Sequence, residues 1–489
     1  MTEPGAATQS VASPDAEAIV VGAGMAGLVV AHDMARAGRR VIVIESAPEV
    51  GGLLRRGALA GVDIDLGAES FATRTDAVAA LVADAQLGLD LVSPRPQGAW
   101  LAIATDESVV RARLPRRTVL GIPADPEADD VVAIIGVDGA ARAREERLLP
   151  VDPDAEPSLY DLVGQRLGER VADRLVDTLC RSVYSRPAAE VRLSQLHPGM
   201  WREFVALGSL LAAADAIATG QRAGAAVGGI AGGMWRLPTA LAQAAAAHGA
   251  DIRTGVDVRA VRPADGMVIV ETASGMLTAP HVVIATGPAE AARLRAGDTP
   301  RSLSEERSEE SKRARSTTGG GGVVHLVAAA IAHPGLAGEP VGSGIIVDAA
   351  LPTAAKALTH ITAKWDWARA ATPAGIHLVR LSSRDAAADT LRTADDIARE
   401  VSLLTGLDIA AGQVIDVVAQ QWPDAVADRP VPDTVRGAVH RGIHLAGATV
   451  AGTGLASVIP HARQLAAQLD ELLAAASPSV SSLLTHPAS

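Results

Sequence analysis

Residues 18–52 read AIVVGAGMAGLVVAHDMARAGRRVIVIESAPEVGG, and this stretch decides the fold. A short apolar run leads into Gly22, Gly24 and Gly27, and apolar residues at helical spacing follow. A second apolar run then ends on Glu45. This order of strand, glycine turn, helix, strand and acid is typical of a dinucleotide-binding βαβ unit. A lone G-x-G-x-x-G motif would be weak evidence, but here every neighbouring part falls in register.

The three glycines have separate tasks. Gly22 makes the tight turn, Gly24 lets the backbone approach a pyrophosphate, and Gly27 lets the helix pack close to the strand. Free N–H groups at the start of the helix then hold the phosphates. Glu45 can accept hydrogen bonds from both ribose hydroxyls and would repel a 2′-phosphate.

A glycine pair, Gly51-Gly52, favours FAD over NAD. It follows the second predicted strand closely, where two-dinucleotide-binding flavoproteins pass their backbone beside the cofactor. An ordinary turn is the alternative interpretation. We expect FAD bound non-covalently. The cofactor-binding residues in this stretch are Gly22, Ala23, Gly24, Met25, Ala26, Gly27, Glu45, Ser46, Gly51, Gly52 and Leu53.

Composition excludes several classes of protein. A chain of 489 residues suits two or three lobes, and its net charge of −12 argues against nucleic acid as a partner. Cys180 is the only cysteine, so neither an intramolecular disulfide nor a cysteine metal cluster can form, and a reducing cytoplasm fits. We expect no metal. We also expect at most peripheral membrane contact, because no stretch reaches the ~18 uncharged apolar residues of a spanning helix. Arginine almost replaces lysine, which is typical of a GC-rich bacterial genome.

The order of segments predicts an α/β fold with lobes interleaved along the chain. Short β runs near 256–261, 267–270 and 281–288 resemble strands that complete the nucleotide domain after a long insertion. The predicted boundaries are 1–16 for a disordered leader, 17–75, 224–292 and 418–476 for the FAD-binding domain, 76–223 for a mainly helical insertion and substrate lobe, 293–322 for a disordered loop, 323–417 for a mixed substrate-binding domain and 477–489 for a tail.

Seven separated segments share their order with one enzyme family. They are DLGAESFATR (65–74), LPRRTVLGIP (114–123), VYS (183–185), IAGGMWRLP (230–238), AKW (363–365), QWP (421–423) and AGATVAGTGLASV (446–458). Together they resemble the flavin-dependent protoporphyrinogen and coproporphyrinogen oxidases of haem synthesis, within the amine-oxidase-like flavoprotein group. The resemblance covers about residues 18–475. It implies a Rossmann-like FAD domain of the two-dinucleotide-binding type, interleaved with a mixed substrate domain and an inserted helical lobe.

The resemblance also implies roles for single residues. The first and last segments would hold the reactive half of the flavin, with backbone N–H groups and the positive end of the last helix at its pyrimidine edge. Val258 would hold the adenosine side, and Trp422 would pack near the cofactor. The chain departs from the family at Ala68 and Ala448, where proline and asparagine are frequent. The further cofactor-binding residues are Gly67, Ala68, Glu69, Ser70, Val258, Thr286, Trp422, Gly447, Leu455, Ala456 and Val458.

The implied reaction removes six electrons from a porphyrinogen, with O₂ reoxidising the flavin to give H₂O₂, and it needs no acid–base residue of the protein. The carboxylates of the substrate require arginines, and the alternative for each arginine is a solvated surface charge. Two aromatic residues could face the macrocycle, and the alternative for each is a place in the core. Coproporphyrinogen III is favoured over protoporphyrinogen IX, since its four propionates suit several arginines. The candidates are Arg74, Arg113, Arg116, Arg117, Tyr184 and Trp365.

Three other functions remain open for the same fold. A flavin amine oxidase typically places aromatics upright before the flavin, yet none occurs between His444 and Pro460. A carotenoid-type desaturase is a second alternative. A flavin-free protein that binds lipids or prenyl groups, like a chaperone, is a third, and the retained phosphate unit with Glu45 argues against it.

Overall fold

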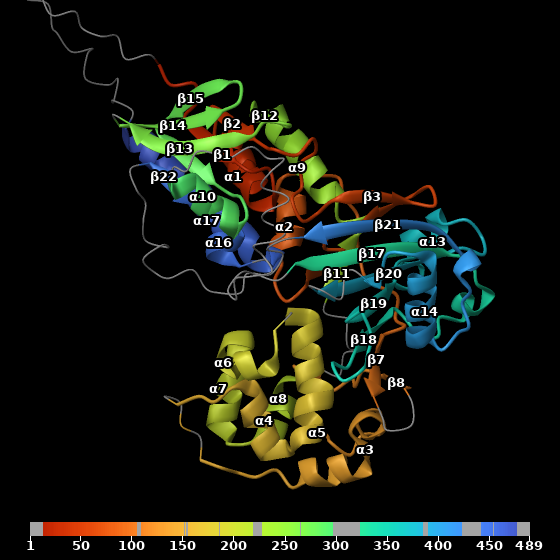
Figure 1. Ribbon diagram of the computed structural model, residues 1–489. Helices are drawn as coiled ribbons and strands as arrows, with labels where there is room; N and C mark the ends of the chain where they lie inside the picture. The colour runs from red at the N-terminus through yellow and green to blue at the C-terminus, as the bar shows by residue number, and fades with distance from the viewer. Residues whose placement is uncertain are drawn as a thin grey trace, which may run out of the picture.

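The computed structural model describes residues 13–104, 109–150, 152, 155–184, 186–218, 227–264, 266–296, 323–384, 390–422, 442–452 and 454–476. The predicted tail, residues 1–12 of the predicted leader and the predicted loop from residue 297 onward lie outside this part of the chain. Figure 1 shows three bodies: a parallel sheet with its helices at the upper left, a large mixed sheet at the right, and a helical lobe below.

A five-stranded parallel sheet gathers segments that lie far apart in the sequence. Its strand order is β12-β2-β1-β16-β22, and every pairing is parallel. The prediction that distant segments complete the sheet begun near residues 18–44 is therefore confirmed. The strands are β1 (Ala18–Val21), β2 (Val41–Ile44), β12 (Asp251–Arg253), β16 (His281–Ile284) and β22 (Ile443–Leu445).

Both faces of this sheet are buried, which explains why its strands are continuous apolar runs. Ala18 and Val20 belong to a core shared with three helices on one face. Ile19 and Val21 belong to a second core under an antiparallel sheet on the other face. The three helices are α1 (Met25–Arg36), α9 (Arg236–Ala247) and α17 (Leu455–Ala476).

The antiparallel sheet on the second face has three strands, β13 (Val258–Ala264), β14 (Met267–Thr272) and β15 (Gly275–Ala279). It packs there with α10 (Pro288–Ala296). The sequence correctly predicts strands in this region, but they form their own sheet and do not extend the parallel one. Their connections are too short for the crossover that a parallel pairing needs.

A seven-stranded mixed sheet has the order β21-β17-β20-β19-β18-β7-β8, and only β18 and β7 pair in parallel. Two of its strands, β7 and β8, come from the segment predicted as mainly helical, and β21 runs past the predicted boundary at residue 417. The apolar run of β7 could not be distinguished from a buried helix by its periodicity. The strands are β7 (Ala99–Ala104), β8 (Val109–Arg113), β17 (Val324–Ile331), β18 (Gly344–Val347), β19 (Ala357–His360), β20 (His377–Arg384) and β21 (Val414–Trp422).

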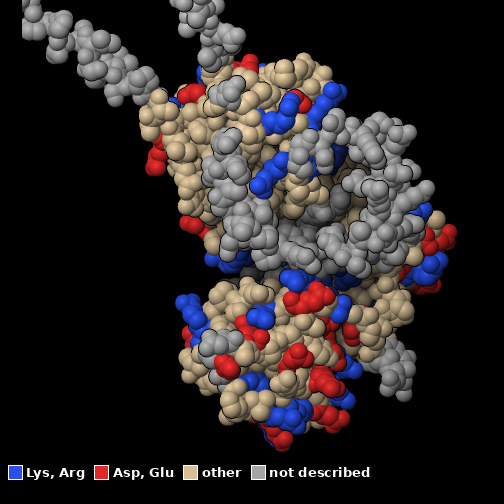
Figure 2. All heavy atoms as spheres, turned by 60° about the vertical axis from the view of Figure 1, so that its left-hand side comes forward, with Lys and Arg blue, Asp and Glu red and all other residues tan. Residues whose placement is uncertain are grey.

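The helical lobe packs around a core of its own, in which Cys180 and Phe204 are fully enclosed. Burial raises the pKa of the Cys180 thiol to about 12. Figure 2 shows acidic and basic side chains interspersed over this lobe. Its helices are α3 (Asp129–Arg144), α4 (Leu159–Leu167), α5 (Glu169–Val171) with π-helical turns onward to Tyr184, α6 (Leu193–Leu196), α7 (Pro198–Leu207) and α8 (Leu210–Ile217).

The remaining elements connect these bodies or cover them. Within the described ranges, no helix combines the length and the apolar character needed to cross a membrane. The elements are β3 (Arg56–Leu59), β4 (Val62–Asp65), β5 (Phe71–Ala72), α2 (Ala77–Asp84), β6 (Leu91–Val92), β9 (Thr118–Val119), β10 (Ile122–Pro123), β11 (Val227–Ile230), α12 (Ile361–Lys364), α13 (Asp366–Ala371), α14 (Ala394–Thr405) and α16 (Ala448–Ala451).

Candidate functional site

The glycine turn after β1 has the close contacts that the motif predicts. Gly22 has a φ of +102°, and a Cβ atom there would lie 3.1 Å from the carbonyl of Ala285 and 3.3 Å from the Cγ2 atom of Thr286. A Cβ atom at Gly27 would overlap the carbonyl oxygen of Gly22. The predicted steric tasks of Gly22 and Gly27 are therefore confirmed, and Thr286 lies beside the turn.

Gly24 differs from both, because a Cβ atom built on it would meet no protein atom within 4 Å. Gly24 is the N-cap of α1, and no side chain caps this helix end. The first turn of α1 therefore presents N–H groups and the positive end of its dipole toward open space. An anion such as a pyrophosphate fits this position.

The Glu45 carboxylate is held beside that turn. One oxygen accepts from the Ala23 N–H at 2.7 Å, and the other accepts from the Ala47 N–H at 2.9 Å. The chain leading into β13 lies alongside, since the Val256 N–H donates to the Glu45 carbonyl at 2.9 Å. The structure thus brings the predicted ribose ligand next to the phosphate turn, with Val258 following on the same chain segment.

The second glycine pair packs on the first motif. The Gly51 N–H donates to the Ala23 carbonyl at 2.9 Å, and a Cβ atom at Gly52 would lie 3.3 Å from the Cα atom of Gly24. Both glycines have positive φ, +128° and +57°. The pair is a turn, as the alternative interpretation held, but one whose backbone passes directly beside Gly24.

The loop of residues 66–70 is built on the same segment. The Ala68 N–H donates to the Leu53 carbonyl at 3.1 Å, and a Cβ atom at Gly67 would overlap that carbonyl oxygen. The Trp422 indole N–H donates to the Leu66 carbonyl at 2.6 Å. The predicted flavin-facing loop, the second glycine pair and Trp422 are therefore contiguous, and the Ala68 side chain is the exposed tip of the loop.

The Glu69 carboxylate does not point into open space. It is buried beside Lys364 Nζ at 2.6 Å and Arg380 Nη2 at 3.3 Å, so only the backbone of Glu69 remains available to line a flavin. Burial raises the pKa of Glu69, but the charges of Arg380 and Lys364 outweigh this effect and hold the pKa at about 2. No role was predicted for Lys364, and Arg380 was not predicted as a site residue. The sequence signal for this pair is Lys364 itself, one of three lysines in the chain.

Asp65 is a second buried acid at the same loop, and it was not predicted as a site residue. Its carboxylate accepts from the N–H groups of Met234 and Trp235, both at 2.9 Å. Burial raises the pKa of Asp65 to about 6, against the opposing effect of these two hydrogen bonds.

The C-terminal segment contacts the start of α1 from the other side. Gly447 has a φ of +79°, and its Cβ position lies 3.3 Å from the Cβ atom of Ala26. The Val458 N–H donates to the Gly454 carbonyl at 3.0 Å, and Leu455 packs against the core that contains Ala26. Ala456 lies between them in the first turn of α17.

Thr449 was not predicted as a site residue. Its hydroxyl oxygen is buried and has no hydrogen-bond partner among the described residues. The sequence signal is a hydroxyl in the glycine-rich turn after β22. A bound polar group would satisfy this oxygen, and a flavin edge is such a group.

The predicted substrate arginines are dispersed. Arg74 is exposed beyond β5. Arg113 stacks on the Trp100 ring at 5.3 Å and, with Arg116, borders a cavity of about 70 Å³, too small for a macrocycle. Two of these arginines have acidic partners: Asp130 lies 4.0 Å from Arg116, and Asp215 pairs with Arg117.

Of the two aromatic candidates for the substrate site, only Trp365 has a described side chain. Trp365 is only 2% exposed, and its ring packs 2.7 Å from the Cβ position of Gly229. The prediction that this ring faces the macrocycle is therefore not supported, because the ring fills a core. The side chain of Tyr184 lies outside the described residues.

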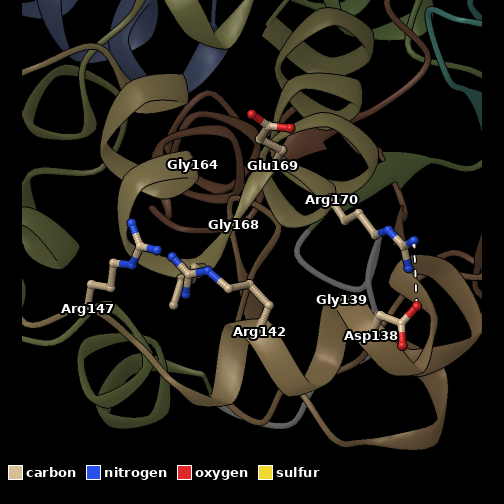
Figure 3. Close-up of a pocket in the computed structure, with 9 residues that line it drawn as sticks. Asp138, Gly139, Arg142, Arg147, Gly164, Gly168, Glu169 and Arg170 are labelled. Atoms are coloured by element: carbon tan, nitrogen blue, oxygen red, sulfur yellow. Dashed lines mark ion pairs between the residues drawn. The ribbon is translucent and has the colours of Figure 1, made fainter.

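A larger cavity, of about 410 Å³, opens between α3, α4 and α5, at the end of the helical lobe away from the parallel sheet (Figures 1 and 3). Arg142 and Arg147 point toward each other across it (Figure 3). Arg142 donates to the Gln165 and Arg166 carbonyls at the end of α4, at 3.1 and 3.0 Å. This arginine therefore caps a helix, and the cavity is separate from the predicted flavin residues.

These contacts fit a bound FAD along one continuous path. The path runs from Glu45, past the open N-terminus of α1 at Gly24 and the pair Gly51-Gly52, to the loop at Gly67. Glycine stands wherever the backbones approach one another, and the space over Gly24 is free.

The chain belongs to the flavin-containing amine oxidoreductase family, whose model matches residues 25–468. It is therefore a flavin oxidoreductase by family. Among its relatives, the coproporphyrinogen III oxidase of Mycobacterium tuberculosis is 28% identical over 417 residues, covering 83% of this chain and 86% of the relative. The enzyme of the same name from Mycobacterium leprae is 29% identical over 418 residues, with the same coverage.

Solved structures show the same fold. The "putative protoporphyrinogen oxidase" of Exiguobacterium sp. 255-15 superposes with a TM-score of 0.77 at 19% identity, covering 94% of this chain and 99% of the other. The cyclohexylamine oxidase of Brevibacterium oxydans gives a TM-score of 0.62 at 17% identity, covering 94% and 100%.

Proposed function

We propose that the protein uses non-covalently bound FAD and O₂ to oxidise a porphyrinogen to a porphyrin, with coproporphyrinogen III as the preferred substrate and protoporphyrinogen IX second. The porphyrinogen loses six electrons and six protons, and three O₂ molecules take them up as three H₂O₂. The product is a coproporphyrin, an intermediate of haem synthesis.

One observation carries this proposal. The similarity to coproporphyrinogen III oxidases spans 83% of the chain, and so includes both the cofactor segments and the regions around them. The retained phosphate turn, with Glu45 hydrogen-bonded beside it, supports binding of the adenine half of FAD.

FAD, when bound, supplies the acceptor for hydride from carbon, and the chain's residues supply its placement. Glu45 would accept the ribose hydroxyls, and the first turn of α1 would hold the phosphates. The N-terminus of α17 would stabilise negative charge at the pyrimidine edge by about 0.3–1 kcal/mol, and by more if partly buried. Val258, Thr286, Trp422 and Gly447 complete the proposed cofactor site.

The defining experiment uses the purified holoprotein and porphyrinogens reduced anaerobically. On admission of air, coproporphyrinogen III should give porphyrin fluorescence together with O₂ uptake and H₂O₂, faster than protoporphyrinogen IX does. Bound FAD without activity on either porphyrinogen would overturn the proposed substrate class. A protein that takes up no added FAD would instead refute the cofactor, and would favour a flavin-free binding protein.

Arg74 is an exposed candidate for a propionate ligand. Arg74→Ala should raise KM more than it lowers kcat, because the arginine would bind a part of the substrate that does not react. Steady-state kinetics with coproporphyrinogen III measure both constants. Arg117→Ala is a matched control, since Arg117 is already paired with Asp215. An unchanged KM for Arg74→Ala would remove Arg74 from the site.

An amine oxidase is the rival that the structural neighbours favour, because cyclohexylamine oxidase shares the fold. The absence of aromatic residues between His444 and Pro460 argues against an upright aromatic beside the flavin. Cyclohexylamine and putrescine should therefore give no H₂O₂ with the holoprotein. Turnover of either amine in place of a porphyrinogen would reverse the assignment.

A further inference from the structure

We propose that Glu69, Lys364 and Arg380 form a positioning cluster, which holds the loop of residues 66–70 against the flavin and balances the charge next to it. This inference rests on the proposed FAD site. The three side chains are called the Glu69 cluster below.

The geometry of the cluster is that of a buried, fully bonded carboxylate. Lys364 Nζ lies 2.6 Å from one oxygen of Glu69, and the Thr359 hydroxyl lies 3.4 Å from the same oxygen. Arg380 Nη2 lies 3.3 Å from the other oxygen. The Glu69, Lys364 and Arg380 side chains are 8%, 14% and 11% exposed, so solvent screens their interaction little.

Arg380 also binds the backbone of the loop. Its Nη1 donates to the carbonyls of Asp65 at 3.2 Å and Gly67 at 2.7 Å. Arg380 lies on β20 and Lys364 at the end of α12, so the cluster joins the seven-stranded sheet to a loop that is built on the nucleotide-binding segment. The Arg380 guanidinium therefore fixes the position of the loop backbone relative to the seven-stranded sheet.

The bonding pattern of the loop shows which of its backbone groups have no protein partner. The N–H groups of Leu66 and Ala68 and the Leu66 and Gly67 carbonyls bind other parts of the protein. Within the described part of the chain, the N–H groups of Gly67, Glu69 and Ser70 have no acceptor. These donors are therefore free to bind a ligand whose edge accepts hydrogen bonds, as a flavin edge does.

Charge is balanced at this position. The Asp65 carboxylate, which accepts from the Met234 and Trp235 N–H groups, is a second acid that interacts electrostatically with Arg380 and Glu69, so two acids and two cations lie in this region. Removing Glu69 leaves an excess positive charge beside the flavin, and removing Lys364 leaves an excess negative charge. Reduced flavin is anionic, so the two changes must shift its reduction potential in opposite directions.

The test uses the full chain with FAD and three variants, Glu69→Gln, Lys364→Met and the double variant. Glu69→Gln should raise the flavin midpoint potential and Lys364→Met should lower it. Each single variant should weaken FAD binding by about tenfold, because each leaves a buried charge uncompensated. The double variant keeps the Arg380 bonds to the loop, so its potential should return toward the wild-type value and its Kd to within about threefold.

Equal-sign shifts, or potentials and Kd values indistinguishable from wild type, would overturn the proposal. If Glu69→Gln alone fails to fold, the double variant decides, because the proposal requires it to bind FAD. A wild-type protein that binds no FAD would refute the proposed function itself, which separates the two failures.

The Glu146–Arg166 pair in the helical lobe is the matched control. Its side chains are 5% and 2% exposed and lie 3.6 Å apart, but the pair is remote from the loop. Glu146→Gln should lower the thermal midpoint while leaving FAD affinity and flavin potential unchanged. A purely structural Glu69 cluster would behave in the same way as this control.

Discussion

Gly24 and Gly27 stand three residues apart and are needed for different reasons. The protein itself leaves no room for a Cβ atom at Gly27, but leaves ample room at Gly24. Gly24→Ala should therefore leave the stability of the apoprotein almost unchanged, since the φ of −75° suits alanine. It should still weaken FAD binding by roughly tenfold or more, because the methyl group would occupy the phosphate position.

Thermal unfolding of the apoprotein and FAD titration measure the two effects separately. Gly27→Ala is the contrasting variant, and it should lower the stability of the apoprotein by at least about 1–3 kcal/mol. Wild-type FAD affinity in Gly24→Ala would show that the open space over Gly24 is not the phosphate site.

Trp422 supports a second residue-scale prediction. Trp422→Phe removes the hydrogen bond to the Leu66 carbonyl and keeps most of the ring that packs on Gly67. We expect about 1 kcal/mol less stabilisation of the loop, and hence an FAD Kd about fivefold higher. Trp367→Phe is a suitable control, because the Trp367 indole N–H has no partner among the described residues.

Positions with steric constraints on the backbone were predictable, and side chains paired across the fold were not. The tasks of Gly22 and Gly27 follow from the motif alone. The Lys364–Glu69 ion pair spans 295 positions of sequence, and no periodicity links its members. Trp365 could not be assigned either, because a core aromatic and a substrate-facing aromatic have the same local pattern.

At the scale of elements, two neighbouring strands of the parallel sheet carry a histidine pair. His281 Nδ1 on β16 lies 3.2 Å from His444 Nε2 on β22. Burial, with a smaller effect from His281, lowers the pKa of His444 to about 4. At least one of the two rings must be neutral to accept this hydrogen bond, and protonation of both would leave two donors facing each other.

The folded-state pKa of His444 lies below its ordinary value, so its contribution to stability is complete above about pH 6.5 and is lost as the pH falls toward 4. Between pH 7 and pH 5 this amounts to about 2 kcal/mol. Between pH 7 and pH 5, the free energy of unfolding of His444→Gln should therefore fall by about 2 kcal/mol less than that of the wild type. Urea unfolding at both pH values gives the comparison, and parallel losses in the two proteins would contradict it.

The sequence predicted individual strands better than their partners. The runs that became β1, β2 and β16 were predicted with their sheet, because the βαβ motif specifies a parallel pairing. The strands β13 and β14 were predicted, but they pair only with each other and with β15. The strands β7 and β8 were missed inside a segment judged helical. Strand pairing depends on distant segments, which a single sequence does not identify.

At the scale of the whole molecule, the chain leaves and re-enters the nucleotide-binding unit repeatedly. The last entry supplies β22 and α17, whose Leu465 and Leu469 lie in the same core as α1. The sequence correctly predicted this interleaving, because the β runs return after the long insertion.

A chain ending at residue 441 should therefore bind no FAD and show no cooperative unfolding transition, although it contains the complete glycine motif. A chain ending at Ala476 keeps every described element and should behave as wild type. Circular dichroism during heating and FAD fluorescence test both chains. FAD binding by the shorter chain would show that the N-terminal unit folds alone.

The enclosed Cys180 has a practical consequence for kinetics in the native state. It is the chain's only cysteine, and neither solvent nor ionisation makes its sulfur reactive while the helical lobe is closed. Labelling by a thiol reagent therefore proceeds only through transient opening of that lobe. The labelling rate, with and without a porphyrin present, reports how often the lobe opens and whether an occupant slows that opening.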